Sequence, residues 1–406
     1  MKTGRWFLFA AVSALVVALT GCAGDGPSAA DRAGDLYLQG LFELYEGLAD
    51  VDADDAPWEW DANVDSALSK FEEALEHDPD HCGALLGSAL TRVLGVITDP
   101  ELGEILRRLF PADRGAAPRS LFWFAAPPDV AGLARHFDEH RDDFHFSELQ
   151  EYVESTALPS LGVADERLTR FEELGCQVGL VIVLPDAAGE KDQLVPVELD
   201  VADAYFAHAA LDALESVAHL IASYDVDVDD GQSLQTLVET DPDFLTLRPG
   251  GHLQSTYGEI ASVGLHLLDA ADALEAETDE QSDDLITLRD GYVRLEELLG
   301  VGALETIRDL GEDIGDALDQ GLSFELSDLE PGAPSVTVLV DLDELLNDPL
   351  GDLRDYLPAH TWPTPDSMRV TRPVTMPDPA LGGVTPGMTD GDWAKIVEWL
   401  ESGDPR

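Results

Sequence analysis

Most of this 406-residue chain carries apolar residues at the spacing of an amphipathic helix. In residues 35–49 they recur every three or four positions, so they share one helix face. The same period predicts further helices at residues 64–77, 84–96, 130–141, 147–156, 164–174, 201–224, 253–276, 284–299, 304–318 and 392–400. The chain is therefore expected to be mostly α, with a helical-hairpin or solenoid-like body.

Two short runs rich in branched apolar residues predict strands instead. Residues 180–184 and 194–199 flank a loop that holds Pro185 and Gly189, so we expect them to pair antiparallel. A further strand is expected at residues 335–340. The predicted class is mostly α with a small antiparallel β-sheet.

One predicted helix has small residues around a single large aromatic. Ala67, Phe71 and Ala74, followed by Pro79, resemble the second helix of a tetratricopeptide repeat. The two alanines let a neighbouring helix approach, Phe71 fills the groove between helices, and Pro79 follows the helix end. The resemblance covers residues 35–96 and implies one helical hairpin rather than a regular array.

The chain is strongly acidic, with 82 Asp and Glu against 23 Lys and Arg and a net charge of −59. Nucleic acids and anionic lipid surfaces are poor partners, because both repel a field of this sign. The 45% of apolar residues is enough for a core, so global disorder is not expected. An acidic surface adapted to high salt, or a cationic partner, explains the charge. Concentrated salt screens self-repulsion within ~3 Å, which favours the first.

The N-terminus combines a basic start, an apolar run and a cysteine. Lys2 and Arg5 precede apolar residues 6–19, and Leu-Thr-Gly-Cys ends at Cys22. This resembles a bacterial lipoprotein signal peptide with its lipobox. The resemblance implies cleavage before Cys22, acyl chains on that cysteine and attachment to a membrane of the cell envelope. Ala23 resembles the sorting pattern for the outer membrane, on its periplasmic side, if two membranes are present. The alternative, an ordinary secretory signal, leaves Cys22 unexplained.

Two cysteines remain, Cys82 and Cys176. An even pair in an exported chain predicts one disulfide. Two small buried apolar side chains are the alternative. Both interpretations stay open, since the sequence does not give the distance between the two Cα atoms.

Residues 136–140 match H-x-x-E-H, which resembles the zinc motif of the inverted-motif metallopeptidases, the inverzincins. The resemblance implies that His136 and His140 bind zinc, that Glu139 activates water, and that a downstream acid such as Glu215 is the third ligand. Charged residues bracket the motif on both sides. We therefore expect a solvated helix face, without catalysis.

Four polar residues of the helix predicted at 201–224 share one stripe: His208, Asp212, Glu215 and His219. A metal ion would fit between the two His–carboxylate pairs if another helix supplied ligands. Apolar residues occupy the opposite face, so we expect the stripe to face water. The sequence therefore assigns no residue as a metal ligand.

Two near-identical acidic stretches, residues 50–55 and 225–230, resemble the start of an EF-hand loop. Calcium is therefore a candidate ligand. Neither stretch has Gly at the sixth loop position or Glu at the twelfth. Solvated acidic loops are the expectation here.

The chain is divided by these features into a signal peptide, a tether, a tetratricopeptide-like region, a β-hairpin with long helices, and a C-terminal region of strand, irregular segment and closing helix. In the order just given, these regions cover residues 1–21, 22–32, 33–178, 179–330 and 331–406. In the last region, residues 376–389 resemble a closing segment of uncharacterised bacterial lipoproteins, a resemblance that brings no known activity with it.

The sequence contains no nucleophile elbow, Walker loop, dinucleotide fingerprint or CxxC motif. The expected function is a lipid-anchored, non-enzymatic module that binds a protein partner or supports assembly. No catalytic residue, cofactor or nucleic-acid partner is expected. A zinc metallopeptidase and a calcium-dependent surface protein are the alternatives.

Overall fold

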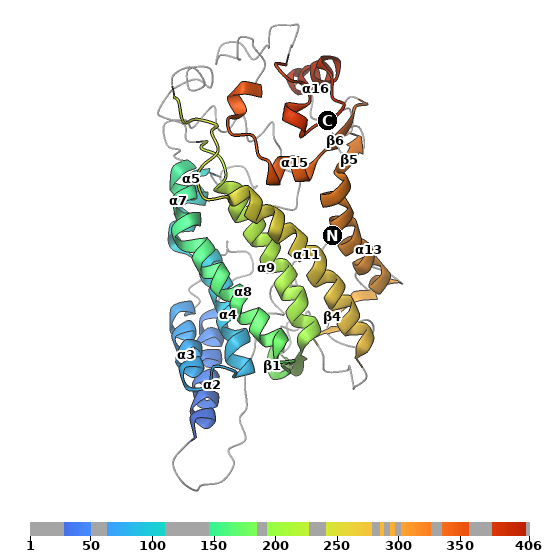
Figure 1. Cartoon of the computed structure of the whole chain (residues 1–406). Coiled ribbons are helices and arrows are strands. Elements are labelled where there is room, and N and C mark those ends of the chain that lie inside the picture. Colours follow the sequence, from blue (N-terminus) through green and yellow to red (C-terminus); the bar gives the residue numbers. More distant parts are fainter. Residues whose placement is uncertain are drawn as a thin grey trace. The chain divides into compact units, whose positions relative to one another are not determined.

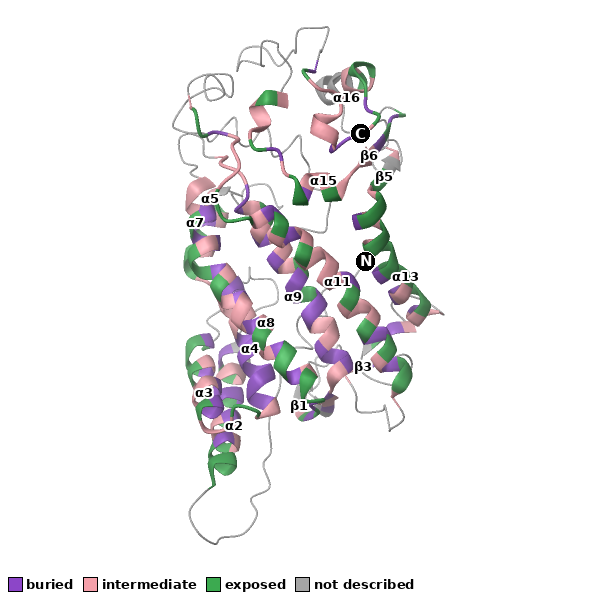
Figure 2. Ribbon diagram, in the orientation of Figure 1, coloured by how far each residue is buried: buried purple, intermediate pink, exposed green. Residues whose placement is uncertain are grey.

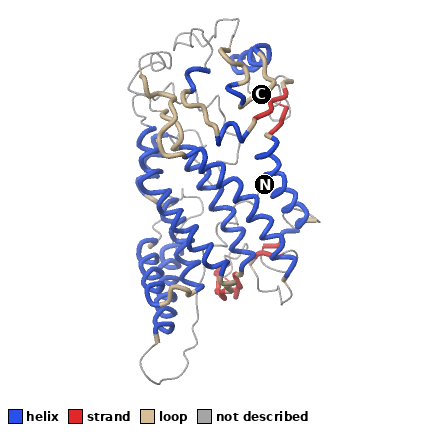
Figure 3. The backbone as a smooth tube through the Cα atoms, viewed as in Figure 1, coloured by secondary structure: helices blue, strands red, loops and turns tan. Residues whose placement is uncertain are grey.

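Helices make up most of the described structure (Figure 1 and Figure 3). The structure is a computed structural model, and it describes residues 28–49, 63–109, 146–184, 193–226, 241–277, 285–287, 293–296, 302–325, 335–356 and 376–402. The predicted mostly α class with small β-sheets is confirmed. The chain divides into two compact units. Unit 1 comprises residues 1–123, 156–213 and 262–312, and unit 2 comprises residues 124–155, 214–261 and 313–406.

Unit 1 begins with four helices in sequence: α2 (Ala29–Ala49), α3 (Val64–His77), α4 (Cys82–Ile97) and α5 (Pro100–Leu109). Helix α2 starts earlier than the predicted residue 35, because Ser28 and Asp31 form a capping box. The Ser28 hydroxyl accepts from the Asp31 amide at 3.1 Å, and the Asp31 carboxylate accepts from the Ser28 amide at 2.9 Å. The predicted tether is therefore too long at its C-terminal end, since residues 29–32 are helical.

The core between α2, α3 and α4 is built around the Phe71 ring. Ala67, Phe71 and Ala74 are all fully buried. Tyr37 of α2 packs on Phe71, with ring centroids 6.0 Å apart. Figure 2 shows that much of α4 is buried as well.

One helical stretch among the described residues, Cys82–Arg108, is long and apolar enough by composition to cross a membrane. The apolar 18-residue part of this stretch is 67% buried inside the protein, and α4 packs against α3 and α8. The apolar residues of α4 therefore serve the protein core.

Helix α8 (Leu158–Glu173) follows α7 (Phe146–Tyr152) through one π-helical turn (Val153–Ala157). The sequence predicted two separate helices here, at residues 147–156 and 164–174. That separation is wrong, because the residues between them are helical as well. Pro159, at the start of α8, lacks the N–H that an unbroken α-helix would use there, and the π-helical turn lies just before it.

The predicted β-hairpin is present as β1 (Val178–Leu184) and β2 (Gln193–Leu199), which pair antiparallel with Leu180 opposite Val197. The helix predicted at residues 284–299 is wrong at residues 286–287 and 293–294, whereas residues 295–296 are helical. Residues 286–287 and 293–294 form the short parallel pair β3 (Ile286–Thr287) and β4 (Val293–Arg294). The Leu285 amide donates to the Glu198 carbonyl at 3.0 Å, which holds this segment extended.

Long helices complete the fold: α9 (Val201–Ile221), α11 (His252–Ala276) and α13 (Ala303–Gln320). Each contributes residues to both units. In unit 1 they share an apolar cluster of Ala202, Ala271, Leu274, Leu295, Ala303 and Ile307.

Unit 2 contains a second antiparallel pair, β5 (Leu322–Glu325) and β6 (Thr337–Val340). Only β6 was predicted. Gly321 ends α13 at a φ of +80° and turns the chain into β5. The remaining elements are α15 (Leu342–Asn347), two 3-10 turns (Leu353–Tyr356 and Leu381–Gly383) and α16 (Asp390–Ser402).

The closing helix α16 docks on unit 2 through its first turns. Trp393 and Ile396 pack against a cluster of Val336, Val338 and Met388. The Trp393 indole donates to the Pro379 carbonyl at 2.8 Å.

Candidate functional site

Three helices of unit 1 bring two histidines and three carboxylates together. Helix α8 supplies Asp165 and Glu172, α9 supplies His208 and Asp212, and α11 supplies His266. We call these five residues the His208 centre. On α8 and on α9 the paired residues lie seven and four positions apart, so each pair shares one helix face.

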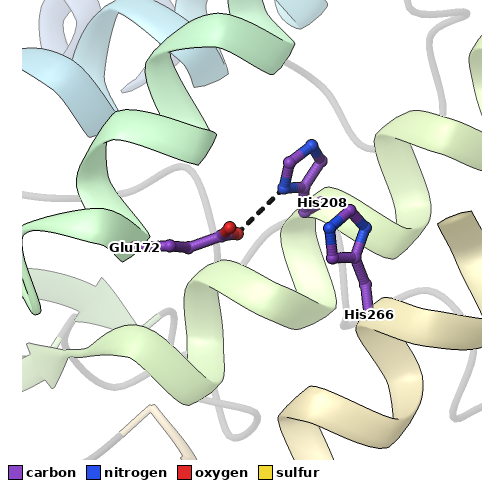
Figure 4. A group of neighbouring side chains, drawn as sticks. All are labelled: Glu172, His208 and His266. Atoms are coloured by element: carbon purple, nitrogen blue, oxygen red, sulfur yellow. Dashed lines mark hydrogen bonds and ion pairs between the residues drawn. The ribbon is translucent and has the colours of Figure 1, made fainter.

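His208 has a carboxylate at both ring nitrogens. Its Nδ1 lies 2.9 Å from Oε1 of Glu172, and its Nε2 lies 2.6 Å from Oδ1 of Asp165. Oδ1 of Asp212 lies 3.8 Å from the same Nε2. Figure 4 shows Glu172 directed at the His208 ring. His208 is only 2% exposed, so these carboxylates replace water around it.

Asp212 connects His208 to the second histidine. Its Oδ2 lies 2.6 Å from Nδ1 of His266, and Asp212 is only 1% exposed. The two imidazole rings stack face to face, with centroids 3.9 Å apart and planes at 19° (Figure 4). Tyr205 stacks on His266 at 6.1 Å. The second histidine is therefore held by one hydrogen bond and two ring contacts.

Two effects act on the pKa of His208 in opposite directions. Burial lowers it, while hydrogen bonds to Asp165 and Glu172 and the charges of Glu172 and Asp212 raise it. The carboxylates prevail and raise the pKa of His208 to about 10. With these partners both ring nitrogens donate hydrogen bonds, and the ring is an imidazolium ion at neutral pH.

The chemistry of the centre is that of a cation site. Three carboxylates surround one imidazolium, so negative charge remains in excess. The centre contains two overlapping sets of three residues, and within each set the ligand atoms lie within 4.8 Å of one another. One set is Asp165, His208 and Asp212, and the other is Glu172, His208 and His266.

The predicted polar stripe of α9 is thus not a solvated face. His208, Asp212 and Glu215 are all buried, which contradicts the expectation that they face water. Polar residues enter a core when charged or hydrogen-bonding partners replace water, and the partners of His208 and Asp212 lie on α8 and α11. His219 belongs to a different group, in unit 2.

Sequence reasoning missed Asp165, Glu172 and His266. Each lies within a predicted helix, but no motif connects the three segments. The i, i+7 spacing of the two acids on α8 was the only available signal, and it is common in a chain this acidic.

Several other predicted sites lie outside the described residues. These are Cys22, the motif residues His136, Glu139 and His140, the acidic stretch 50–55, and all but the first two residues of 225–230.

Cys82 and Cys176 are joined by a disulfide, with their Cα atoms 5.6 Å apart. Of the two alternatives left open by the sequence, the structure contains the bridge. It ties the start of α4 to the residues between α8 and β1.

Unit 2 has its own polar cluster. Gln150 donates to the carbonyls of Ile221 and Tyr224 at 2.8 and 2.6 Å, and accepts from Arg248 at 2.6 Å. Arg248 also donates to Glu154 at 2.9 Å.

A histidine pair extends this cluster. Nε2 of His252 lies 3.3 Å from Glu154, and its Nδ1 lies 3.0 Å from Nδ1 of His219. Only one of the two facing nitrogens is able to carry the shared proton.

Comparisons with protein-family models, with curated proteins and with solved structures found no match for the chain.

Proposed function

We propose that the protein is an exported, lipid-anchored binding or assembly module of the cell envelope. The observation that carries the proposal is the Leu-Thr-Gly-Cys segment ending at Cys22, after a basic and apolar leader. The Cys82–Cys176 bridge supports export independently, because disulfides persist in oxidising compartments and are rare in the cytosol.

The binding role is supported by the helical packing in unit 1. Helices α2, α3 and α4 pack around a buried Phe71 flanked by small residues, the pattern that resembles a tetratricopeptide hairpin. Stacked helical hairpins present extended surfaces to protein partners. Cleavage before Cys22 removes Lys2 and Arg5 and no acid, which leaves 385 residues with a net charge of −61. A field of this sign favours a basic partner surface.

Detergent phase partitioning tests the anchor. The wild-type chain should enter the detergent phase, and a Cys22→Ala variant should stay in the aqueous phase. A Cys82→Ser, Cys176→Ser double variant is the matched control, and it should partition like the wild type. Equal partitioning of wild type and Cys22→Ala would refute lipid anchoring.

Photo-cross-linking in intact cells tests the binding role. Phe42 lies on α2 and is 51% exposed, so a photoreactive residue there reports on the hairpin surface. The proposal expects one discrete protein adduct that high salt weakens. Absence of any adduct, here and at other exposed positions of α2 and α3, would count against a protein-binding role.

A further inference from the structure

We propose that the His208 centre binds one divalent first-row transition-metal ion, with Asp165, His208 and Asp212 as its protein ligands. This site goes beyond the proposed envelope function and does not depend on it.

The ligand atoms are close enough to share one ion. Nε2 of His208 lies 2.6 Å from Oδ1 of Asp165 and 3.8 Å from Oδ1 of Asp212, and the three residues place ligand atoms within 4.8 Å of one another. Two atoms bound to one metal at ~2.1 Å lie roughly 3–4 Å apart. Binding replaces the Nε2 proton of His208 with the ion, and Asp165 has to retreat from its hydrogen bond to that nitrogen. At 41% side-chain exposure it is the one ligand with room to move.

The neighbours of the ligands have the arrangement that metal sites use to orient them. A metal-bound histidine usually donates its other ring N–H to a carboxylate, and a bound carboxylate is usually hydrogen-bonded in turn. Glu172 lies 2.9 Å from Nδ1 of His208, which leaves Nε2 for the ion. His266 holds Oδ2 of Asp212 at 2.6 Å, which leaves Oδ1 for the ion.

The second set of ligand atoms is unsuited to the same ion. Imidazole nitrogen lone pairs lie in the ring plane, and the rings of His208 and His266 are stacked at 3.9 Å with planes only 19° apart. Lone pairs in two nearly parallel planes do not converge on one point. We therefore assign Glu172 and His266 as positioning residues and not as ligands.

Charge and ligand type define the class of ion. Three carboxylates gather around His208, and two of them, Glu172 and Asp212, are almost fully buried. A divalent cation offsets this charge better than a single proton does. One imidazole nitrogen with two carboxylate oxygens suits Zn²⁺, Mn²⁺ or Fe²⁺, whereas Ca²⁺ takes oxygen ligands only. Three protein ligands leave further positions open to water on the side of Asp165.

Equilibrium dialysis of the purified full chain in detergent, after chelator treatment, tests the site with ZnCl2, MnCl2 and CaCl2 separately. We expect about one Zn²⁺ or Mn²⁺ per chain and weaker binding of Ca²⁺. His208→Gln should lower the affinity at least ~10-fold, and Glu172→Gln should lower it ~10-fold by releasing the ring. His219→Gln in unit 2 is the matched histidine control and should bind like the wild type.

Asp165→Asn keeps the test decisive if the buried variants fail to fold. Its side chain is partly exposed, so its circular dichroism should match that of the wild type while its affinity falls at least ~10-fold. The proposal is overturned if the folded wild type binds no ion stoichiometrically, or if Asp165→Asn binds like the wild type. Equal affinity for Ca²⁺ and Zn²⁺ would also overturn it, because that result describes a diffuse acidic surface.

Discussion

The Phe71 ring lies so close to Gly87 that a Cβ atom on Gly87 would be 2.7 Å from Cε1 of the ring. Gly40 of α2 lies equally close, since a Cβ atom there would be 2.7 Å from the same ring atom. The buried aromatic therefore needs a glycine on each of the two helices that enclose it.

Gly87→Ala and Gly40→Ala should each destabilise the protein by about 1–3 kcal/mol, because the added methyl forces the Phe71 ring out of its packed position. Gly34→Ala on the same helix as Gly40 is the control. Its Cβ would meet no atom within 4 Å, so alanine there should be neutral or stabilise by up to ~1 kcal/mol. Urea unfolding followed by circular dichroism measures all three. Equal effects of Gly34→Ala and Gly87→Ala would contradict the packing described here.

Reduction of the Cys82–Cys176 bridge should lower the free energy of unfolding by about 4 kcal/mol. The two cysteines are 94 residues apart, so the bridge closes a long loop in the unfolded chain and removes much of its entropy. Unfolding curves with and without a reductant measure the loss. The Cys82→Ser, Cys176→Ser variant should start at the lower stability and show no further response to reductant. Free thiols in freshly purified protein, detected by mass spectrometry of unreduced peptides, would show that the bridge does not form.

Glu72 connects three helices of unit 1. It accepts from Ser88 at 2.6 Å, from Arg92 at 2.9 Å and from Arg167 at 3.1 Å. Burial alone would raise the pKa of Glu72, but these donors outweigh it and lower the pKa. Glu72→Gln should lower the free energy of unfolding by about 1–2 kcal/mol, because the guanidinium groups of Arg92 and Arg167 lose their shared counter-charge.

The adjacent Glu73 provides a matched control for that loss. Its pair with Lys70 at 3.1 Å involves one cation only, and the two side chains are 45% and 32% exposed, so Glu73→Gln should lower the free energy of unfolding by less than ~0.5 kcal/mol. Thermal unfolding compares the two variants. If Glu73→Gln proved the more damaging, the Glu72 network would not be a main connection between these helices.

The His219–His252 pair should make unit 2 less stable in mild acid. Burial and the neighbouring His252 lower the pKa of His219 from 6.5 to about 4. The unfolded chain therefore binds a proton between pH ~6.5 and ~4 that the folded protein does not. This stabilisation is complete above pH 6.5 and is lost as the pH falls towards 4, with a total of about 3 kcal/mol.

One acid and one base, Glu154 and Arg248, lie next to the His219–His252 pair. Glu154 lies 3.3 Å from His252, and Arg248 donates to Glu154 at 2.9 Å. General protonation of carboxylates also destabilises the protein in acid, so the useful quantity is the difference from His219→Asn. That variant keeps a donor near the position of Nδ1 but does not titrate. Parallel pH profiles of stability for the two proteins would rule out the effect.

Local sequence was enough to identify most of the elements. The helical period located α3 at residues 64–77, and branched apolar runs located β1 and β2. The burial of Phe71 and its flanking alanines agreed with what the tetratricopeptide resemblance implied. These features depend on side chains a few positions apart, which the sequence states directly.

Other features depended on segments remote in the chain. The β5 strand exists because β6 pairs with it. Residues 285–287 are held extended because Glu198 of β2 accepts from the Leu285 amide and Asp203 of α9 accepts from the Ile286 amide. Periodicity alone assigned the second segment to a helix. Backbone groups adopt the partner that tertiary packing brings to them.

The sequence by itself determined the acidic charge, the succession of helices and the fact that His208 and Asp212 share one helix face. It did not determine which face of α9 is buried. Spacing shows which residues lie together, whereas burial of a polar face depends on partners that replace water. Those partners, Asp165 and Glu172 on α8 and His266 on α11, are brought to His208 only by the tertiary structure.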